Sequence, residues 1–310
     1  MNQTTVIVPG TTANIGVGFD CLGAALTIYN EFRFTPLDET AKLVITVEGE
    51  EAERVSTDQS NLLYQSFLKL YQHIDRTPPG VAIHTKMVVP LARGLGSSAT
   101  AIVGGLMGAN ELAGKPLSTA EIIELAIAIE GHPDNVVPAL LGNCQLSVGE
   151  VGNWQIAEIP WHSDIIPVVA IPNFELSTEE ARSVLPNTYT RSDAIFNLSR
   201  MGLLQRGLAT NNQGWLTMAL ADKLHQPYRQ KLIKGYGKVK EAAIAAGAYG
   251  MVISGAGPTL LALCDRNYEE KVVSAMANAW QSEGILPVVK SLALDDRGAR
   301  IVQSQRFHHR

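Results

Sequence analysis

Apolar residues in the first third of the chain come in short runs that glycine, proline or acidic residues interrupt. Three of these runs, Thr4–Val8, Tyr29–Thr35 and Lys42–Val47, alternate in polarity or are rich in β-branched residues, which predicts strands. Asn61–His73 instead spaces its leucine, phenylalanine and tyrosine residues at helical intervals, so we predict a helix there. A further strand is predicted over Gly80–Val89.

A glycine-rich turn and two helices follow that strand. The helices are predicted over Ala99–Leu112 and Ala120–Ile129, and Ser118 has the spacing to a later glutamate that opens a helix with a capping box. Gly104 and Gly105 lie inside the first of these helices, where each costs about 1 kcal/mol relative to alanine. We therefore predict close backbone packing around these two glycines.

The second half of the chain mixes helices with adjacent strands. Its predicted elements are a strand over Ile165–Ile171, helices over Thr178–Ser183, Arg191–Ala209, Gln213–Lys223, Gln226–Ala246 and Tyr268–Gln281, a strand, glycine turn and strand over Tyr249–Asp265, and a closing strand over Leu286–Leu292. Because helices and strands do not strictly alternate, this order predicts an α+β fold. The apolar pattern lapses around Trp154–Ser163, so we predict two domains, residues 1–160 and residues 161–310.

The composition narrows the class of partner. The chain has 310 residues, of which 46% are hydrophobic and 18% charged, and its net charge is -5 with lysine and arginine scattered along it. Nucleic acid and anionic membranes are not expected to bind such a chain, because both require clustered positive charge. Small molecules are the expected partners.

The ends and the cysteines indicate the compartment. No run of about 18 apolar residues is present, and the first residues, MNQTTVIVPGTT, lack the basic start of a signal peptide, so we expect a cytoplasmic protein. Cys21, Cys144 and Cys264 lie far apart and form no metal-ligand spacing. We expect them to be reduced and mostly buried, with no disulfide and no zinc site.

The stretch Pro90–Thr100, PLARGLGSSAT, combines small residues with hydroxyls between a predicted strand and a predicted helix. Its glycines allow the backbone to curl around an anion, and the unpaired amides and positive dipole at a helix start bind phosphate. A hydroxyl of Ser97 or Ser98 can then ligate magnesium. An ordinary helix N-cap with a flexible lead-in is the alternative interpretation.

Three familiar glycine-rich motifs do not account for this turn. Gly94–Ala99 has the form G-x-G-x-x-A of a dinucleotide fingerprint, yet the helix after it leads to another predicted helix instead of a strand. The nearest Walker-type stretch, Gly108–Pro116, is one residue too long and carries proline where serine or threonine binds magnesium. The G-x-S-x-G spacing of a nucleophile elbow is absent.

Two more segments are rich in glycine and small residues like this turn. They are Pro9–Gly23, PGTTANIGVGFDCLG, and Ser254–Thr259, SGAGPT. Three such turns fit one site for a large anion. In this order the segments resemble the GHMP kinases, along essentially the whole chain. Pro9–Gly23 lacks the Lys or Arg that mevalonate kinase and galactokinase carry after Pro-Gly. It is similar to the homoserine kinase family, as are Glu130–Pro138, Ser177–Arg182 and Gln226–Arg229.

The resemblance implies a kinase that transfers the γ-phosphate of ATP to the side-chain hydroxyl of L-homoserine. The products would be O-phospho-L-homoserine and ADP, in threonine biosynthesis, with ATP and Mg²⁺ as the expected cofactors. It also implies an N-terminal ribosomal-protein-like α/β domain that binds the nucleotide and a C-terminal ferredoxin-like α+β domain that contributes to the substrate pocket. A homodimer is expected from the resemblance as well.

The resemblance assigns roles only where the motifs match. Ser98 and Glu130 would hold Mg²⁺, and together with Asn14 and Asn135 they form the predicted catalytic set. The residues expected to bind the nucleotide are Asn61, Lys86, Pro90, Leu91, Ala92, Arg93, Gly94, Leu95, Gly96, Ser97, Ser98, Ala99 and Thr100. Those expected to surround the amino acid are Asn14, Asp20, His132, Asn135, Thr178, Arg182 and Arg229.

Homoserine is a zwitterion with a neutral reacting group. Its pocket therefore needs a cation for the carboxylate, an anion or carbonyls for the ammonium, and a polar partner for the hydroxyl. Arg182 and Arg229 suit the carboxylate because a guanidinium binds it through two parallel hydrogen bonds. Asp20 suits the ammonium, and Asn14 or Asn135 suits the hydroxyl.

Most of these residues also have a structural interpretation. Arg182 could form a surface ion pair on its own helix, Asp20 and Asn14 could be turn residues, and His132 could meet the terminal carbonyls of a helix. Glu130 fits a solvated face poorly, because it ends an otherwise apolar helix directly before a glycine.

One position departs from related kinases. Mevalonate and galactose kinases carry a catalytic aspartate where this chain has Asn135, and an amide accepts no proton at neutral pH. Phosphoryl transfer tolerates this, because its loose transition state depends on positioning and charge neutralisation. We therefore expect catalysis without a dedicated side-chain base. Another GHMP kinase for a related hydroxylated acid and an inactive nucleotide sensor are the alternatives. Ser98 and Glu130 argue against the sensor, since a pure binder needs no magnesium pair.

Overall fold

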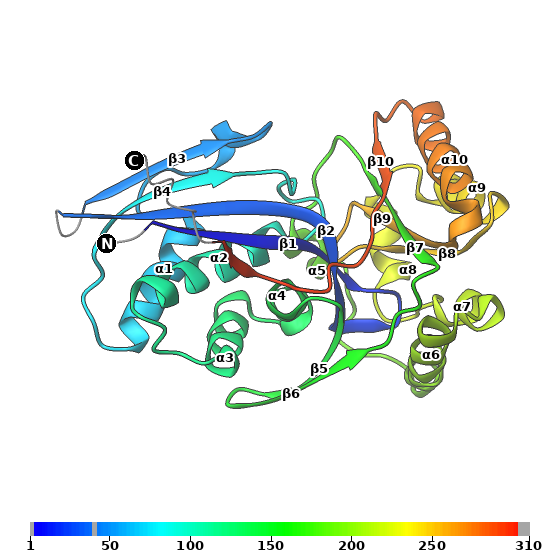
Figure 1. Cartoon of the computed structure of the whole chain (residues 1–310). Helices are drawn as coiled ribbons and strands as arrows, with labels where there is room; N and C mark the ends of the chain where they lie inside the picture. Colours follow the sequence, from blue (N-terminus) through cyan, green and yellow to red (C-terminus); the bar gives the residue numbers. More distant parts are fainter. Residues whose placement is uncertain (1–2, 39–41, 303–310) are drawn as a thin grey trace.

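The computed structural model describes residues 3–38 and 42–302, which form two sheets with helices packed against them (Figure 1). The first sheet has the strand order β11-β1-β2-β4-β3, and the β5–β6 ribbon continues it from the start of β2. Only β3 and β4 are parallel among the described pairs. Its strands are β1 (Thr4–Asn14), β2 (Gly18–Leu37), β3 (Leu43–Glu48), β4 (Gly80–Lys86), β5 (Cys144–Glu150), β6 (Asn153–Ile159) and β11 (Arg300–Val302).

Four helices lie on one side of this sheet, below it in Figure 1, and two of them contact its central strands. They are α1 (Leu62–His73), α2 (Ser97–Leu112), α3 (Thr119–Glu130) and α4 (Pro133–Leu141). Asn61 caps α1 by accepting a hydrogen bond from the amide of Tyr64. Ser118 and Glu121 form the predicted capping box of α3.

The core under the first sheet depends on the close approach of α2 to its neighbours. Phe32 of β2 is buried under α2, where Gly104 faces its ring. Gly105 faces the backbone carbonyl of Leu63 on α1. A side chain at either position would collide with these atoms, so the predicted close packing around the two glycines is confirmed.

The second sheet is antiparallel, with the order β10-β7-β9-β8. It is formed by β7 (Ile165–Ile171), β8 (Ala248–Ile253), β9 (Leu260–Asp265) and β10 (Val288–Ser291). One face packs against α9 (Tyr236–Ala245) and α10 (Glu269–Ser282), and the other packs toward the first sheet. Burial on both faces explains why β7, β8 and β9 are largely continuous apolar runs instead of alternating patterns, whereas the edge strand β10 is partly exposed.

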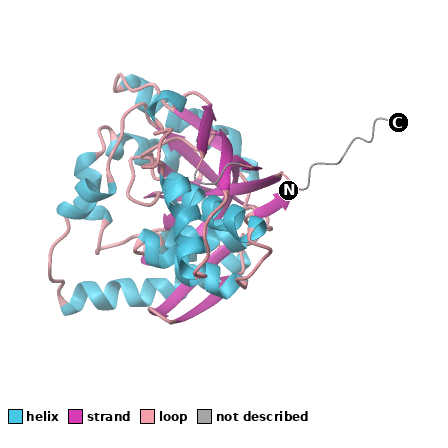
Figure 2. Cartoon of the chain, turned by 90° about the vertical axis from the view of Figure 1, so that its left-hand side faces the viewer, coloured by secondary structure: helices cyan, strands magenta, loops and turns pink. Residues whose placement is uncertain are grey.

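Four helices of different lengths lie between the second sheet's first strand and α9. Between β7 and α9 the chain forms α5 (Thr178–Ser183), α6 (Arg191–Thr210), α7 (Gln213–Ala219) and α8 (Gln226–Arg229), and single 3-10 turns cover Ala52–Arg54, Gln230–Leu232 and Arg266–Tyr268. In the turned view of Figure 2, helices and strands pack against one another, and the left part of the view holds helices and loops. The predicted α+β class is confirmed.

Several predicted elements need correction. Gln226–Ala246 is not one helix, because α8 ends at Arg229 and α9 begins only after Gly235, whose φ of +75° interrupts the helical path. Pro9–Gly23 is not simply a turn, since β1 continues to Asn14 and β2 begins at Gly18. The periodicity also misses α4, β5, β6 and β11. A helix that carries two prolines, as α4 does, and a half-exposed ribbon both give weak signals.

The chain passes from the first sheet to the second between β6 and β7, in the segment where the apolar pattern lapses. β11 returns to the first sheet and pairs with β1. The domain limits, residues 1–160 and 161–310, stay a prediction.

The cysteines are mostly buried, as the sequence predicts. Cys144 and Cys264 are buried, Cys21 is partly buried, and all three are free. Burial raises the pKa of Cys21 to about 11, so little of this thiol is in the reactive thiolate form. Over residues 3–38 and 42–302, no helix has both the length and the hydropathy to cross a membrane.

Gly105→Ala is expected to destabilise the protein although alanine is the better helix former. The added methyl group would meet the Leu63 carbonyl and Ser66, and overpacking of this kind costs about 1–3 kcal/mol. Gly202 in α6 is the matched control, because no atom lies near the position of its Cβ, and Gly202→Ala should stabilise the protein by about 1 kcal/mol. Urea unfolding measures both changes, and equal effects would contradict the tight packing of α2.

Candidate active site

Three glycine-rich segments meet at one place between the two sheets. The hydroxyl of Ser254 donates a hydrogen bond to the carbonyl of Gly94 over 2.6 Å, and the amide of Gly255 donates to the carbonyl of Ala13 over 3.1 Å. Gly94 has a φ of +74°, and a Cβ at this position would collide with the carbonyl of Ser254. The predicted convergence of the three segments is confirmed.

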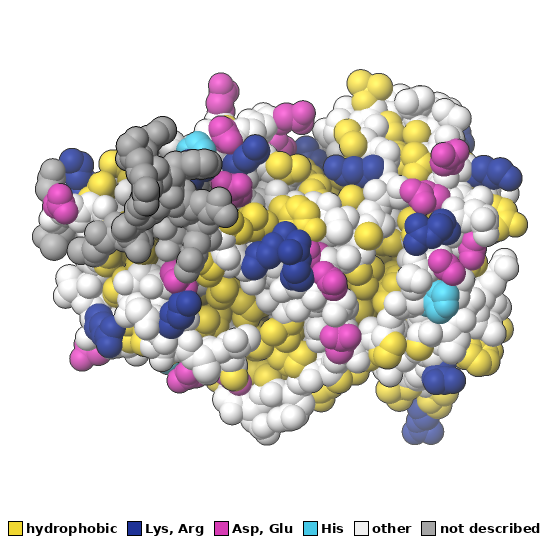
Figure 3. Space-filling view, in the orientation of Figure 1, with side chains coloured by type: hydrophobic (Ala, Val, Ile, Leu, Met, Phe, Trp, Pro, Cys, Tyr) yellow, Lys and Arg dark blue, Asp and Glu magenta, His cyan; other side chains and the backbone are white. Residues whose placement is uncertain are grey.

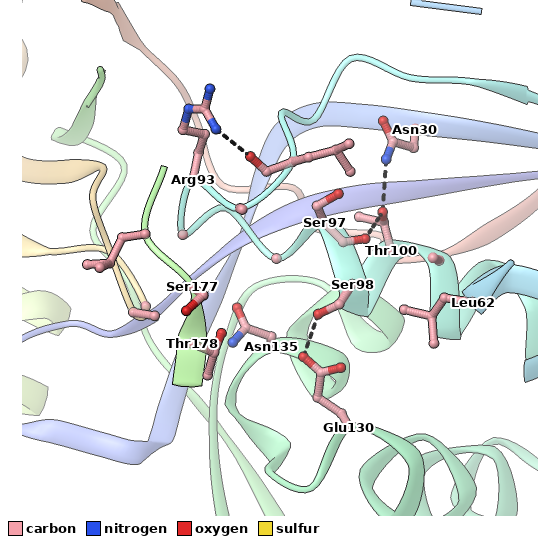
Figure 4. A pocket seen from close by; sticks show the side chains of 18 of the residues that line it. Asn30, Leu62, Arg93, Ser97, Ser98, Thr100, Glu130, Asn135, Ser177 and Thr178 are labelled. Carbon is pink, nitrogen blue, oxygen red and sulfur yellow. Dashed lines mark hydrogen bonds between the residues drawn. The ribbon is translucent and has the colours of Figure 1, made fainter. Parts of the chain in front are cut away.

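A cavity of about 580 Å³ lies where these segments meet. Apolar side chains such as Phe32, Leu62 and Met87 line part of it. Figure 4 shows Leu62 and Thr178 on opposite sides of Ser98. The cavity also brings together every residue predicted to surround the amino acid, Asn14, Asp20, His132, Asn135, Thr178, Arg182 and Arg229. A pocket with an apolar part and a polar part suits a ligand with both characters.

The turn before α2 presents backbone amides to this cavity. Gly96 is the N-cap of α2, and it has a φ of +68° and no side chain to cap the helix. Among the described residues, no acceptor is bonded to the amides of Ser97, Ser98 and Ala99, the first three of the helix. Unpaired amides and the positive end of the helix dipole form an anion site.

The residues predicted to bind a nucleotide divide into two groups. Those that line the cavity are Asn61, Leu91, Ala92, Arg93, Gly94, Gly96, Ser97, Ser98 and Thr100. Pro90, Leu95 and Ala99 are not part of its lining, and the side chains of Leu95 and Ala99 are fully buried in the core.

Lys86 is not where the sequence prediction placed it. Its side chain is exposed and lies outside the cavity lining, whereas its neighbours Thr85 and Met87 belong to that lining. Because successive side chains of a strand point to opposite faces, Lys86 at the end of β4 points away from the cavity.

Ser98 and Glu130 face each other at the N-terminus of α2 (Figure 4). The Ser98 hydroxyl donates to Glu130 Oε1 over 2.7 Å. Glu130 ends α3, and Gly131 then turns the chain with a φ of +90°. Burial raises the pKa of Glu130, and the hydrogen bond from Ser98 opposes this rise only in part. A hydroxyl and a desolvated carboxylate are oxygen ligands of the kind that Mg²⁺ prefers, so this pair fits the metal.

Asp20 and Arg182 form a two-point ion pair beside the cavity. The Asp20 carboxylate accepts from Arg182 Nη1 over 3.0 Å and from Nη2 over 2.9 Å. The ion pair considered for Arg182 therefore links α5 to β2, and the partner is not a residue of its own helix. These hydrogen bonds raise the pKa of Arg182. Both side chains are more than one-third exposed, at 39% for Arg182 and 35% for Asp20, so a ligand can reach them.

Arg229 is a buried cation without a matching anion. Its side chain is only 2% exposed, and its guanidinium donates to the carbonyls of Ala181 and Gly255 over 3.1 Å each. Within the described part of the chain no carboxylate lies at ion-pair distance from it, although Phe19 lies 5.0 Å from its Cζ. Burial accordingly lowers the pKa of Arg229. An uncompensated buried charge at a cavity wall favours an anionic ligand.

The two predicted amides are both held by protein contacts. Asn14 Nδ2 donates to the Gly255 carbonyl over 2.8 Å, and its Oδ1 accepts from the amide of Asp20 over 3.0 Å. Asn135 Oδ1 accepts from the Thr11 hydroxyl over 2.8 Å. Each amide nitrogen carries two hydrogens, so both can still donate to a ligand.

Asp134 is a site residue that sequence reasoning did not single out. It is buried, and its Oδ1 lies 2.6 Å from His132 Nδ1. Burial of His132 disfavours its cation, but the hydrogen bond and charge of Asp134 outweigh this effect and raise the pKa of His132. The available signal was an acidic residue just after a proline, which is typical of the first turn of a helix.

Two family models match the chain, GHMP kinases N terminal domain over residues 61–143 and GHMP kinases C terminal over residues 194–282. A protein from Crocosphaera subtropica named homoserine kinase is 67% identical over 302 residues, which cover 97% of this chain and 98% of that protein. One from Trichormus variabilis with the same name is 66% identical over 299 residues, which cover 96% and 99%.

Solved structures are similar over the same extent. The crystal structure of homoserine kinase from Cytophaga hutchinsonii has a TM-score of 0.89 at 28% identity, and the match covers 97% of this chain and 98% of that one. A crystal structure of mevalonate kinase has a TM-score of 0.69 at 12% identity, with 94% and 98% covered, which shows a shared fold alone.

Asp20→Asn and Arg182→Met are each expected to change the free energy of unfolding by less than about 1 kcal/mol. The ion pair is partly exposed, so water screens it and its net contribution to stability is small. Urea unfolding without ligand measures this. A loss of several kcal/mol would mean that the pair holds the two domains together, independently of any ligand.

Proposed function

The chain belongs to the homoserine kinase family of the GHMP kinases. We propose that it binds ATP and L-homoserine in this cavity and transfers the γ-phosphate of ATP to the side-chain hydroxyl of L-homoserine. It is an ATP-dependent kinase with the two-domain GHMP kinase fold. The products are ADP and O-phospho-L-homoserine, in threonine biosynthesis. One observation supports this most directly: a single cavity joins the amides that begin α2 and the Ser98–Glu130 pair with the charged residues Asp20, Arg182 and Arg229.

The nucleotide is assigned to the side of the cavity that the first domain provides. The triphosphate binds the amides of Ser97 and Ser98, which lack protein acceptors among the described residues. The adenosine lies against Leu62 and Met87, where the lining is apolar. Asn61, which caps α1, completes this part of the wall.

The amino acid is assigned to the opposite side. Its carboxylate binds Arg229, because this buried guanidinium has no ion-pair partner within the described chain, and Arg182 lies close enough to share the charge. Its ammonium binds the carboxylate of Asp20. Thr178 and His132 line the same part of the cavity.

Ser98 and Glu130 are the residues that would hold Mg²⁺. The metal neutralises charge on the phosphates when bound. Within the described residues no group of three His, Cys, Asp or Glu side chains is arranged to hold a metal ion, so phosphate oxygens would complete the ligand set of Ser98 and Glu130.

The reaction needs no dedicated side-chain base in this proposal. Asn135 has no proton-accepting group, Asp20 is bonded to Arg182, and Asp134 is bonded to His132. The side chain of Asn135 instead orients the substrate hydroxyl by a hydrogen bond, while the Ser97 and Ser98 amides hold the phosphates. Positioning of this kind supplies a large part of the rate enhancement in phosphoryl transfer.

The partners expected from the sequence remain small molecules. On the face shown in Figure 3, acidic and basic side chains are interspersed among neutral and apolar ones, without an extended basic patch. The homodimer and the cytoplasmic location stay predictions.

The substrate is tested by coupled ADP release with L-homoserine, mevalonate, galactose and shikimate in parallel. Turnover is expected with L-homoserine alone, because only this compound offers both a carboxylate and an ammonium to the charged part of the cavity. Turnover with another acceptor would point to a different GHMP kinase. No turnover with any of them would favour the inactive nucleotide sensor.

Glu130→Gln is expected to lower kcat by about 10²–10³-fold, because it removes the anionic ligand assigned to Mg²⁺ at the reacting phosphate. Ser98→Ala should have a smaller effect, since the backbone amide of residue 98 remains. Initial rates titrated with Mg²⁺ measure both changes. Glu124→Gln on the same helix is the matched control and should leave kcat unchanged, since Glu124 instead accepts a hydrogen bond from the amide of Gly152. Wild-type rates in Glu130→Gln would contradict the metal assignment.

A further inference from the structure

His225 lies behind the amino-acid part of the cavity and is not part of its lining. Its side chain is fully buried. Nε2 lies 2.8 Å from the carbonyl oxygen of Gly16, and Nδ1 lies 3.4 Å from Nη1 of Arg229. The imidazole also stacks on the ring of Phe19, with centroids 5.0 Å apart and planes 15° apart. One side chain thus contacts both the turn that leads to Asp20 and the arginine assigned to the substrate carboxylate.

The two polar partners of His225 require one protonation state. A carbonyl such as that of Gly16 only accepts and a guanidinium only donates, so Nε2 carries the hydrogen and Nδ1 the lone pair. Burial lowers the pKa of His225, the charge of Asp222 opposes this, and the charge of Arg229 adds to it. Asp222 also accepts hydrogen bonds from the amides of His225 and Gln226, which fixes the start of α8.

The turn that His225 contacts needs support from outside. Asn14, Ile15 and Gly16 have φ values of +70°, +43° and +78°, so three successive residues lie in the left-handed region. A β-branched residue such as Ile15 rarely adopts this conformation, and it persists only where surrounding contacts hold it. The hydrogen bond from His225 to Gly16 and the one from Asn14 to Gly255 are such contacts.

Phe19 lies between His225 and the guanidinium groups of Arg182 and Arg229. Its ring lies 5.0 Å from Cζ of Arg229 and 5.9 Å from Cζ of Arg182, and His225 stacks against it. A shift of the imidazole would therefore move the Phe19 segment relative to both guanidinium groups, and Asp20 directly follows Phe19 in the chain.

We propose that His225 is a positioning residue for the amino-acid substrate. It fixes the spacing between the turn that leads to Asp20 and the guanidinium of Arg229. The site for the substrate ammonium and the site for its carboxylate are then the right distance apart for one zwitterion. It does so without contacting either substrate. The inference rests on the proposed function, because it needs an amino acid in this part of the cavity.

His225→Phe tests this role, since it keeps a ring that can stack on Phe19 and removes both polar atoms. The KM for L-homoserine is expected to rise roughly tenfold or more, the size of one lost buried hydrogen bond. The KM for ATP should stay within about twofold, because the described contacts of His225 do not include the turn before α2, where the triphosphate is assigned. Coupled ADP release gives both constants, and thermal unfolding shows whether the variant is folded.

A pair of amide variants keeps the test decisive if His225→Phe does not fold. Gln is long enough to place an N–H near the position of Nε2, whereas Asn reaches only the position of Nδ1. His225→Gln should therefore retain a KM for L-homoserine near that of the wild type, and His225→Asn should not. Equal KM values for the two variants would overturn the proposal.

Tyr249→Phe is the matched control for a merely structural effect. It removes a hydrogen bond of 2.7 Å between the buried Tyr249 and Asn211, away from the cavity lining. It should lower thermal stability and leave both KM values unchanged. The role of His225 would be refuted if its variants raised the KM values for ATP and L-homoserine equally. Failure of the wild type to phosphorylate L-homoserine would instead refute the proposed function, so the two failures are distinguishable.

Discussion

The contacts that join Ser254 to Gly94 and Gly255 to Ala13 are the constraint on which the site depends. They bring two domains into direct contact, one through the Ser254 hydroxyl and one between backbone groups, and this is possible only because no Cβ stands between Gly94 and the Ser254 carbonyl. These contacts hold the turn before α2 and the segment Ser254–Thr259 together beside the charged groups of the cavity, and phosphoryl transfer depends on such positioning.

At the cavity, desolvation disfavours the charged form of two groups of opposite sign, the partly buried Glu130 and the buried Arg229. Burial raises the pKa of Glu130 and lowers the pKa of Arg229. Each would be stabilised by a ligand of opposite charge, a divalent cation for the carboxylate and a substrate carboxylate for the guanidinium. In the proposed complex, ligands of this kind would restore part of the stability that the desolvated charges cost the free protein.

The sequence was informative where one local signal decided the structure. The capping box at Ser118 and the helical spacing in Asn61–His73 predicted α3 and α1, and the short glycine-rich turns predicted which segments form the cavity. Lys86 was misplaced because residue type does not reveal on which face of β4 a side chain lies. The pairing of Asp20 with Arg182 joins residues 162 positions apart, so no local pattern could predict it.

In the mechanism proposed above no side chain accepts the proton, so orientation matters more than it would in a kinase with a dedicated base. The carboxylates of Asp20 and Asp134 are each bonded to a neighbouring cationic or imidazole group, and Asn135 can only orient a hydroxyl. The reaction then depends on how well the substrate hydroxyl is aligned with the phosphates. That alignment is set by where the ammonium and carboxylate are held. The left-handed turn at Ile15 and the imidazole that supports it are therefore as much part of the catalytic design as the groups that touch the substrate.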